Sequence, residues 1–162
     1  GSSYLNEIMN LIARNIADAE IQVIWQTGDI EFSKYKDLNT DKIKIIPFIN
    51  NMPDAYAISD LIICRSGALT LAEITVCGKP SILIPYPHAA GDHQTKNAQA
   101  LVNANASRLH HQKTLKAKDL QHTIINLIHN GNKLKNMSLA SKQLGRPHAT
   151  KEIVDHILEV IV

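Results

Sequence analysis

Apolar residues recur along the chain with two different periods, which predict alternating helices and strands. From Leu5 to Ala17 they recur every three or four positions, with polar residues on the other face: Asn6, Glu7, Asn10 and Arg14. A helix is therefore expected to start close to the first residue. Four short runs rich in β-branched residues predict strands, and a fifth predicts a short edge strand: 21–26, 42–46, 60–63, 81–84 and 107–111.

Helical patterns separate these runs and follow the last of them. They cover 52–59, the stretch from 68 to 77, a segment opening near 93, and then 115–129, 133–144 and 149–162. Strands that alternate with helices predict an α/β fold, a Rossmann-like, mostly parallel sheet with helices on both faces. Ligands of such sheets bind beyond the carboxyl ends of the strands, so the loops 48–52, 65–69 and 85–97 are expected to converge there.

The composition of the chain indicates a globular domain and argues against nucleic-acid binding and against a membrane-spanning helix. With 162 residues, 44% of them hydrophobic and 20% charged, the chain is expected to form one globular domain over 1–162. The net charge of +2 comes from 17 basic and 15 acidic residues that are interspersed, so a nucleic-acid partner is not expected. No apolar run reaches the roughly 20 residues of a membrane-spanning helix.

The two cysteines indicate the compartment. Cys64 and Cys77 stand in apolar surroundings without the spacing of zinc ligands, so reduced core thiols of a cytoplasmic protein are expected and a metal site is not. Trp25 and Tyr4 are expected to pack in the core or at an interface. His88 and His93 are interpreted as polar loop residues, since their spacing is not that of helical metal ligands.

The stretch 64–73 reads as a strand end, a tight turn and a helix. Ser66 and Gly67 fall where that helix begins, so free backbone N–H groups and the positive end of the helix dipole would favour an anion there. Glu73 lies further along the helix, where a pair of sugar hydroxyls would suit its carboxylate. Taken alone, the stretch favours an ordinary capped helix with Glu73 in solvent. The residues expected to be buried are Leu69, Leu71, Ala72 and Ile74.

Several motifs, taken in order, resemble one known family. They are PFINNM at 47–52, DLIICRSGALT at 60–70 with Glu73, GKP at 78–80, PYPH at 85–88 and HQTKNA at 93–98. Together they resemble the carboxy-terminal domain of the MurG family, bacterial peptidoglycan glycosyltransferases that move N-acetylglucosamine from UDP-N-acetylglucosamine to the lipid-linked acceptor lipid I. The resemblance implies one half of a B-type glycosyltransferase fold. Gly1-Ser2 before Leu5-Asn6 fits either a tag remnant or the end of a glycine-rich loop; in the second case the first strand lies upstream.

The resemblance also implies a donor site. The loop at Ile49 would hold the uracil through its backbone, and Glu73 would accept hydrogen bonds from the ribose hydroxyls. Gln94, supported by Asn97, would contact the sugar, although Asp92-His93 departs from members with a second glutamine there. The turn beside the diphosphate would comprise Ser66, Gly67, Ala68 and Leu69, with Arg65 as a further candidate. Their alternative roles are ordinary: exposed first-turn residues for Gln94 and Asn97, and a structural ion-pair partner for Arg65.

The implied reaction is transfer of N-acetylglucosamine with inversion, forming lipid II, with UDP-N-acetylglucosamine as substrate and no cofactor or metal. The lipid I acceptor, the catalytic base and the contact with the cytoplasmic membrane face would belong to an amino-terminal domain outside this chain. By itself this chain would bind the donor weakly or not at all and would be inactive. The enzyme would be cytoplasmic and peripheral on the inner face of the membrane. Two alternatives remain: the donor half of another UDP-sugar glycosyltransferase or epimerase, and a non-catalytic Rossmann-like interaction module.

Overall fold

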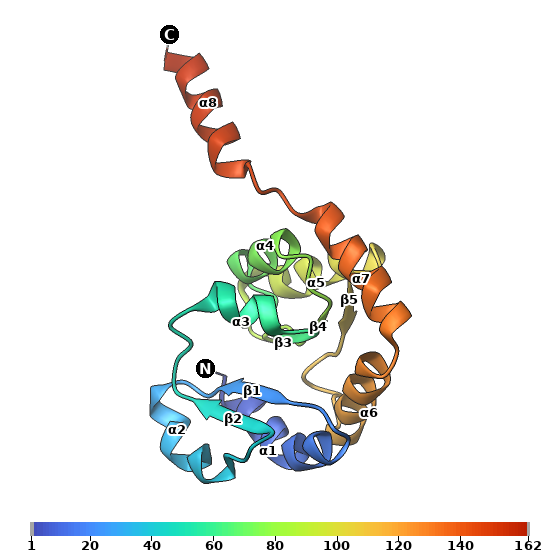
Figure 1. The fold of residues 1–162 in the computed structure, drawn as a ribbon. Helices are drawn as coiled ribbons and strands as arrows, with labels where there is room; N and C mark the ends of the chain where they lie inside the picture. Colours follow the sequence, from blue (N-terminus) through green and yellow to red (C-terminus); the bar gives the residue numbers. More distant parts are fainter. Residues whose placement is uncertain (1, 162) are drawn as a thin grey trace.

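The structure, a computed structural model, describes residues 2–161 and has alternating helices and strands along most of the chain (Figure 1). Its α-helices are α1 (Ser3–Asp18), α2 (Asp29–Tyr35), α3 (Met52–Ile58), α4 (Ala68–Val76), α5 (His93–Asn103), α6 (Ala117–Ile128), α7 (Gly131–Leu144) and α8 (Ala149–Ile161). Its strands are β1 (Val23–Gln26), β2 (Ile43–Ile46), β3 (Ile62–Cys64), β4 (Ser81–Leu83) and β5 (Ser107–Leu109). Two short 3-10 helices, η1 (Lys36–Leu38) and η2 (Ala90–Asp92), complete the order. Each predicted helix and strand is present, which confirms the α/β prediction.

All strand pairs are parallel, as predicted, but they form two sheets rather than one. β1 pairs with β2, and β4 lies between β3 and β5 in the second sheet. The predicted fold class is confirmed, and in residues 2–161 its parallel strands are divided between two sheets, because none of the described strand pairs joins β1 or β2 to the other three strands. β5 is an edge strand, as predicted.

Helices cover both faces of the second sheet, and its central strand shows this most directly. Ile82 on β4 and Ile84 directly after it belong to one buried cluster, together with residues of α1, β1, β2, α6 and α7. Leu83, which points to the opposite face, belongs to a second buried cluster with residues of α3, α4 and α5. Since the first cluster contains residues of both sheets, one core holds them together.

The first helix buries a polar residue that its periodicity placed on the solvent face. Asn6 is only 2% exposed; its Oδ1 accepts a hydrogen bond from Trp25 Nε1 at 2.9 Å, and its Nδ2 donates to the Thr27 carbonyl at 2.9 Å and to the Glu31 carboxylate. The expected polar-face position of Asn6 is wrong, because these partners replace water at a buried site. Trp25 is 5% exposed, which confirms its core position.

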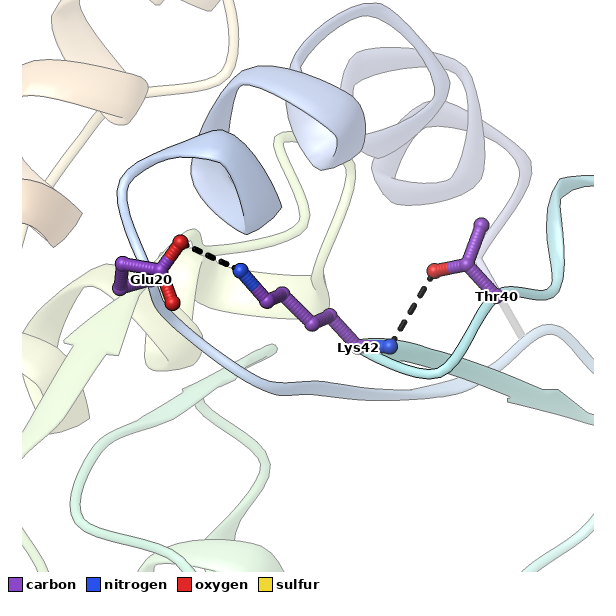
Figure 2. Close-up of polar contacts among 3 residues, drawn as sticks. All are labelled: Glu20, Thr40 and Lys42. Carbon is purple, nitrogen blue, oxygen red and sulfur yellow. Dashed lines mark hydrogen bonds and ion pairs between the residues drawn. The ribbon is translucent and has the colours of Figure 1, made fainter.

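The amino-terminal ends of β1 and β2 are joined by a small polar cluster (Figure 2). Lys42 Nζ lies 2.5 Å from Glu20 Oε1, and the Lys42 backbone N–H donates to Thr40 Oγ1 at 3.2 Å. Glu20 is in the left-handed region, with φ of 62°, where the chain turns from α1 toward β1. This exposed ion pair contributes little stability.

The two cysteines differ in their burial. Cys64 is half-buried and packs against the second cluster, but Cys77 is exposed at the end of α4, so the prediction of two core thiols is wrong for Cys77.

Helix α8 projects away from the body of the molecule (Figure 1). Its apolar side chains are exposed there: Ile153, Val154, Ile157, Leu158 and Val160. Among the described residues, no helix is both long and apolar enough to cross a membrane.

Candidate functional site

The candidate site lies where β2, β3 and β4 end, and its central feature is the uncapped start of α4. Gly67 is the N-cap residue, with φ of −67° and ψ of 145°, and no side chain caps the helix. The Leu71 N–H is bonded to the Gly67 carbonyl at 3.0 Å, so the preceding N–H groups of the first turn have no intrahelical partner. The first turn contains no acidic residue. This helix end therefore offers backbone donors and a positive dipole to an anion.

The space in front of this helix end is open. A Cβ placed on Gly67 would meet nothing within 4 Å. Leu69, in the first turn, is 82% exposed, and Ala72 is exposed too, whereas Leu71 and Ile74 are buried. The predicted burial of Leu69 and Ala72 is wrong, because these positions face away from the sheet.

Ser66 connects this turn to α5 rather than capping α4. Its side chain is fully buried, and its hydroxyl donates to the Gln94 carbonyl at 2.7 Å. Asn97 Nδ2 donates to the Ser66 carbonyl at 3.3 Å, and Gln94 Oε1 accepts from the Tyr86 N–H at 2.9 Å. The structure thus brings together three residues that the resemblance implied. It also rules out the ordinary capping role for the Ser66 side chain.

Arg65 is held by the protein itself. Its Nη1 donates to the carbonyls of Ile84 and Pro85, both at 2.9 Å, and its Nη2 donates to Ser2 Oγ at 2.9 Å and Gln112 Oε1 at 2.6 Å. The guanidinium also lies over the rings of two tyrosines, Tyr4 at 5.9 Å and Tyr86 at 5.6 Å. Burial lowers the pKa of Arg65 from its ordinary value, but the group stays charged. A role beside a diphosphate stays a prediction, since the guanidinium already has four acceptors.

Glu73 has a partner that the sequence did not indicate. Tyr56, on α3, donates its hydroxyl to Glu73 Oε2 at 2.8 Å. The Tyr56 ring is 5% exposed, whereas Glu73 is exposed on α4. Burial raises the pKa of the Tyr56 hydroxyl, and the hydrogen bond and negative charge of Glu73 raise it further, so the phenol is a stable donor. An aromatic residue in a short amphipathic segment reads only as a core residue, so no sequence signal marked this contact.

The loop after β2 is tied to the end of β1. The Ile49 N–H donates to Gln26 Oε1 at 2.9 Å, while the neighbouring Phe48 is 59% exposed. Gln26 was not among the expected site residues, although its place at the carboxyl end of a strand was a usable signal. Its side chain thus fixes the backbone that the resemblance assigned to uracil.

Metal-ligand groups, His93 and the surface cavity are further candidates for parts of the site at the start of α4. In residues 2–161, no group of three or more His, Cys, Asp or Glu side chains is arranged to hold a metal ion. His93 contacts the Ala90 carbonyl within its own loop. A shallow cavity of about 360 Å³ is lined by residues such as Asn105, Arg108 and Lys133, and it lies along β5 and α7 rather than at the start of α4.

Comparison with known proteins identifies the family. The sequence matches the glycosyltransferase family 28 C-terminal domain over residues 1–153. The chain belongs to this family. All of the candidate site residues of this family 28 domain lie within the matched range.

Curated relatives of this family 28 domain share one name. Proteins of Chlorobium phaeobacteroides (41% identical over 144 residues) and Polynucleobacter asymbioticus (42% over 160) are both called UDP-N-acetylglucosamine--N-acetylmuramyl-(pentapeptide) pyrophosphoryl-undecaprenol N-acetylglucosamine transferase. They cover 88% and 96% of the chain, respectively. The chain covers only 40% and 44% of those proteins, so it spans less than half of their length.

Solved structures agree with the fold. The crystal structure of Acinetobacter baumannii MurG is 34% identical, with a TM-score of 0.78 over 85% of this chain and 43% of its own. The kitacinnamycin glycotransferase has a TM-score of 0.70 over 96% of this chain and 39% of its own, at 12% identity, which supports the fold alone. The family 28 domain therefore has the architecture of one half of a B-type glycosyltransferase.

Proposed function

We propose that this chain is the donor-binding domain of a UDP-N-acetylglucosamine transferase that acts on lipid I and forms lipid II in peptidoglycan synthesis. The observation that carries the proposal is the open, uncapped start of α4, with Glu73 further along the same helix and Gln94 bound beside the preceding turn. The names of the curated relatives supply the sugar, the nucleotide and the acceptor.

The geometry suits a nucleoside diphosphate. The diphosphate meets the free N–H groups at 67–69, and the ribose meets Glu73, which lies five residues or about 7.5 Å further along the helix axis. The base lies against the loop at Ile49. Gln94 Oε1 is engaged by the Tyr86 N–H, so the Gln94 amide contributes its Nε2 donors to the sugar hydroxyls.

The same groups assist the departure of UDP. In an inverting displacement, an acceptor hydroxyl attacks the anomeric carbon while the bond to the diphosphate breaks, and negative charge grows on the leaving group. The N–H groups at the start of α4 are already oriented toward that charge, so they stabilise it without reorganising. The acceptor, its base and the peripheral contact with the cytoplasmic membrane face belong to the remainder of the enzyme. In this proposal the sugar nucleotide is a substrate, and the reaction uses no cofactor.

Calorimetric titration of the full-length transferase with UDP-N-acetylglucosamine, UDP-glucose and UDP tests this proposal. UDP-N-acetylglucosamine is expected to bind more tightly than UDP-glucose. Glu73→Ala is expected to weaken UDP binding by about 1–3 kcal/mol, because polar groups of the complex lose their partner. Glu152→Ala, at an exposed glutamate on α8, is the matched control and should leave affinity unchanged. Unchanged UDP affinity in Glu73→Ala would contradict the proposal.

A further inference from the structure

The hydrogen bond between Tyr56 and Glu73 joins a rigid residue to a mobile one. The Tyr56 ring packs in the second core cluster, with residues such as Leu71, Ile74 and Leu83. The Glu73 side chain is exposed, and a glutamate in that setting samples many rotamers unless a partner orders it. At 2.8 Å the phenol is such a partner.

The Glu73 carboxylate has enough free hydrogen-bond acceptor positions to bind a ribose as well. An ionised carboxylate has about four acceptor positions, and Tyr56 occupies one of them, on Oε2. The two hydroxyls of a ribose need two acceptors, so the phenol and the sugar do not compete. A carboxylate that is already ordered loses less side-chain entropy when the ribose binds.

We propose that Tyr56 is a positioning residue for nucleotide recognition, which holds the Glu73 carboxylate in the orientation that accepts the ribose hydroxyls. This inference rests on the proposed function, in which Glu73 contacts the ribose. Tyr56 lies on α3, whose N-cap Asn51 comes two residues after Ile49. The contact therefore also ties the helix that follows the base-binding loop to the helix that carries the ribose acceptor.

The test compares UDP with 2′,3′-dideoxy-UDP, which lacks both ribose hydroxyls, by titration of the full-length transferase. Tyr56→Phe keeps the buried ring and removes only the donor. It is expected to weaken UDP binding about three- to tenfold and to leave 2′,3′-dideoxy-UDP binding unchanged, so the ratio of the two affinities falls. Tyr35→Phe is the matched control, since the Tyr35 hydroxyl is buried and has no hydrogen-bond partner within residues 2–161. This change should alter neither affinity.

A double-mutant cycle gives a second measurement. In a Glu73→Ala background, Tyr56→Phe should have no further effect on UDP binding, because the group that it orients is gone. Equal weakening of both ligands by Tyr56→Phe, or no change in either, would overturn the inference and leave the proposed function intact. A wild-type enzyme that does not bind UDP, or that does not distinguish it from the dideoxy analogue, would overturn the proposed role of Glu73 and the inference with it.

Discussion

Replacing Arg65 with lysine separates its two candidate roles, structural and phosphate-binding. Lysine keeps the positive charge but loses the planar fork that reaches four acceptors and stacks on two aromatic rings. Those acceptors come from three separate parts of the chain: Ser2 before α1, the 84–85 carbonyls after β4, and Gln112 after β5. A single ammonium group cannot satisfy all of them at once.

The expected loss of stability follows from these contacts. A hydrogen bond to a charged group contributes about 1.5–3 kcal/mol, but water and the ammonium group replace part of that at a half-buried site. We therefore expect Arg65→Lys to lower the free energy of unfolding by about 2–4 kcal/mol. For a domain of this size, that corresponds to a decrease in Tm of roughly 5–10 °C.

The assay is thermal and urea unfolding of the chain, followed by circular dichroism, together with UDP titration of the full-length protein well below its Tm. Arg108→Lys is the control, because Arg108 is an exposed arginine on β5. If Arg65 is only structural, UDP affinity should change less than about twofold. An unchanged Tm would refute the structural reasoning, and lost UDP binding with retained stability would assign the guanidinium to the diphosphate.

Two further predictions concern stability. Gly145→Ala should destabilise the chain by about 1–3 kcal/mol in urea unfolding, because the new Cβ would lie 2.8 Å from the Thr75 carbonyl oxygen. Gly131→Ala is the control: a Cβ there meets nothing within 4 Å, so this change should be neutral or slightly stabilising, and equal effects of the two changes would contradict the prediction. Burial lowers the pKa of His110, with a smaller opposing effect of Asp119, so the fold favours the neutral imidazole. The unfolded chain takes up a proton at His110 near pH 6.5, whereas the folded chain does so only at a lower pH. The free energy of unfolding is therefore highest above about pH 6.5 and should decrease as the pH falls from there toward the lower pKa of the folded state. His110→Asn should flatten that dependence, and an unaltered slope would contradict the assignment.

Local pattern was enough to predict the elements but not their limits. The β-branched run at 21–26 predicts a strand, and β1 covers Val23–Gln26. The difference arises because a strand extends only as far as its partner offers hydrogen bonds, and β2 begins at Ile43, opposite Val23. The two-sheet arrangement escaped prediction for the same reason, since pairing depends on neighbours in space.

The side chains of the turn at 64–73 show a second limit. Serine is a common helix-capping residue, yet the Ser66 hydroxyl donates a hydrogen bond to the carbonyl of Gln94, 28 positions along the chain. Leu69 is of a residue type common in cores, yet it is 82% exposed, since it lies on the face of α4 that points away from the sheet, opposite the buried Leu71. The roles expected for Ile49, Gln94 and Asn97 stay predictions, although the structure holds each of them by a specific hydrogen bond.

The sequence by itself determined the order of helices and strands, the family, and the turn at the start of α4, because periodicity, β-branched runs and a contiguous motif are all local properties. Only the tertiary structure decided which polar atoms remain free to meet a ligand. It committed the Ser66 hydroxyl and the Arg65 guanidinium to protein acceptors, left the first N–H groups of α4 open, and placed the Tyr56 hydroxyl against Glu73. Hydrogen bonds between distant segments form only once the chain has folded, so no reading of adjacent residues could have supplied them.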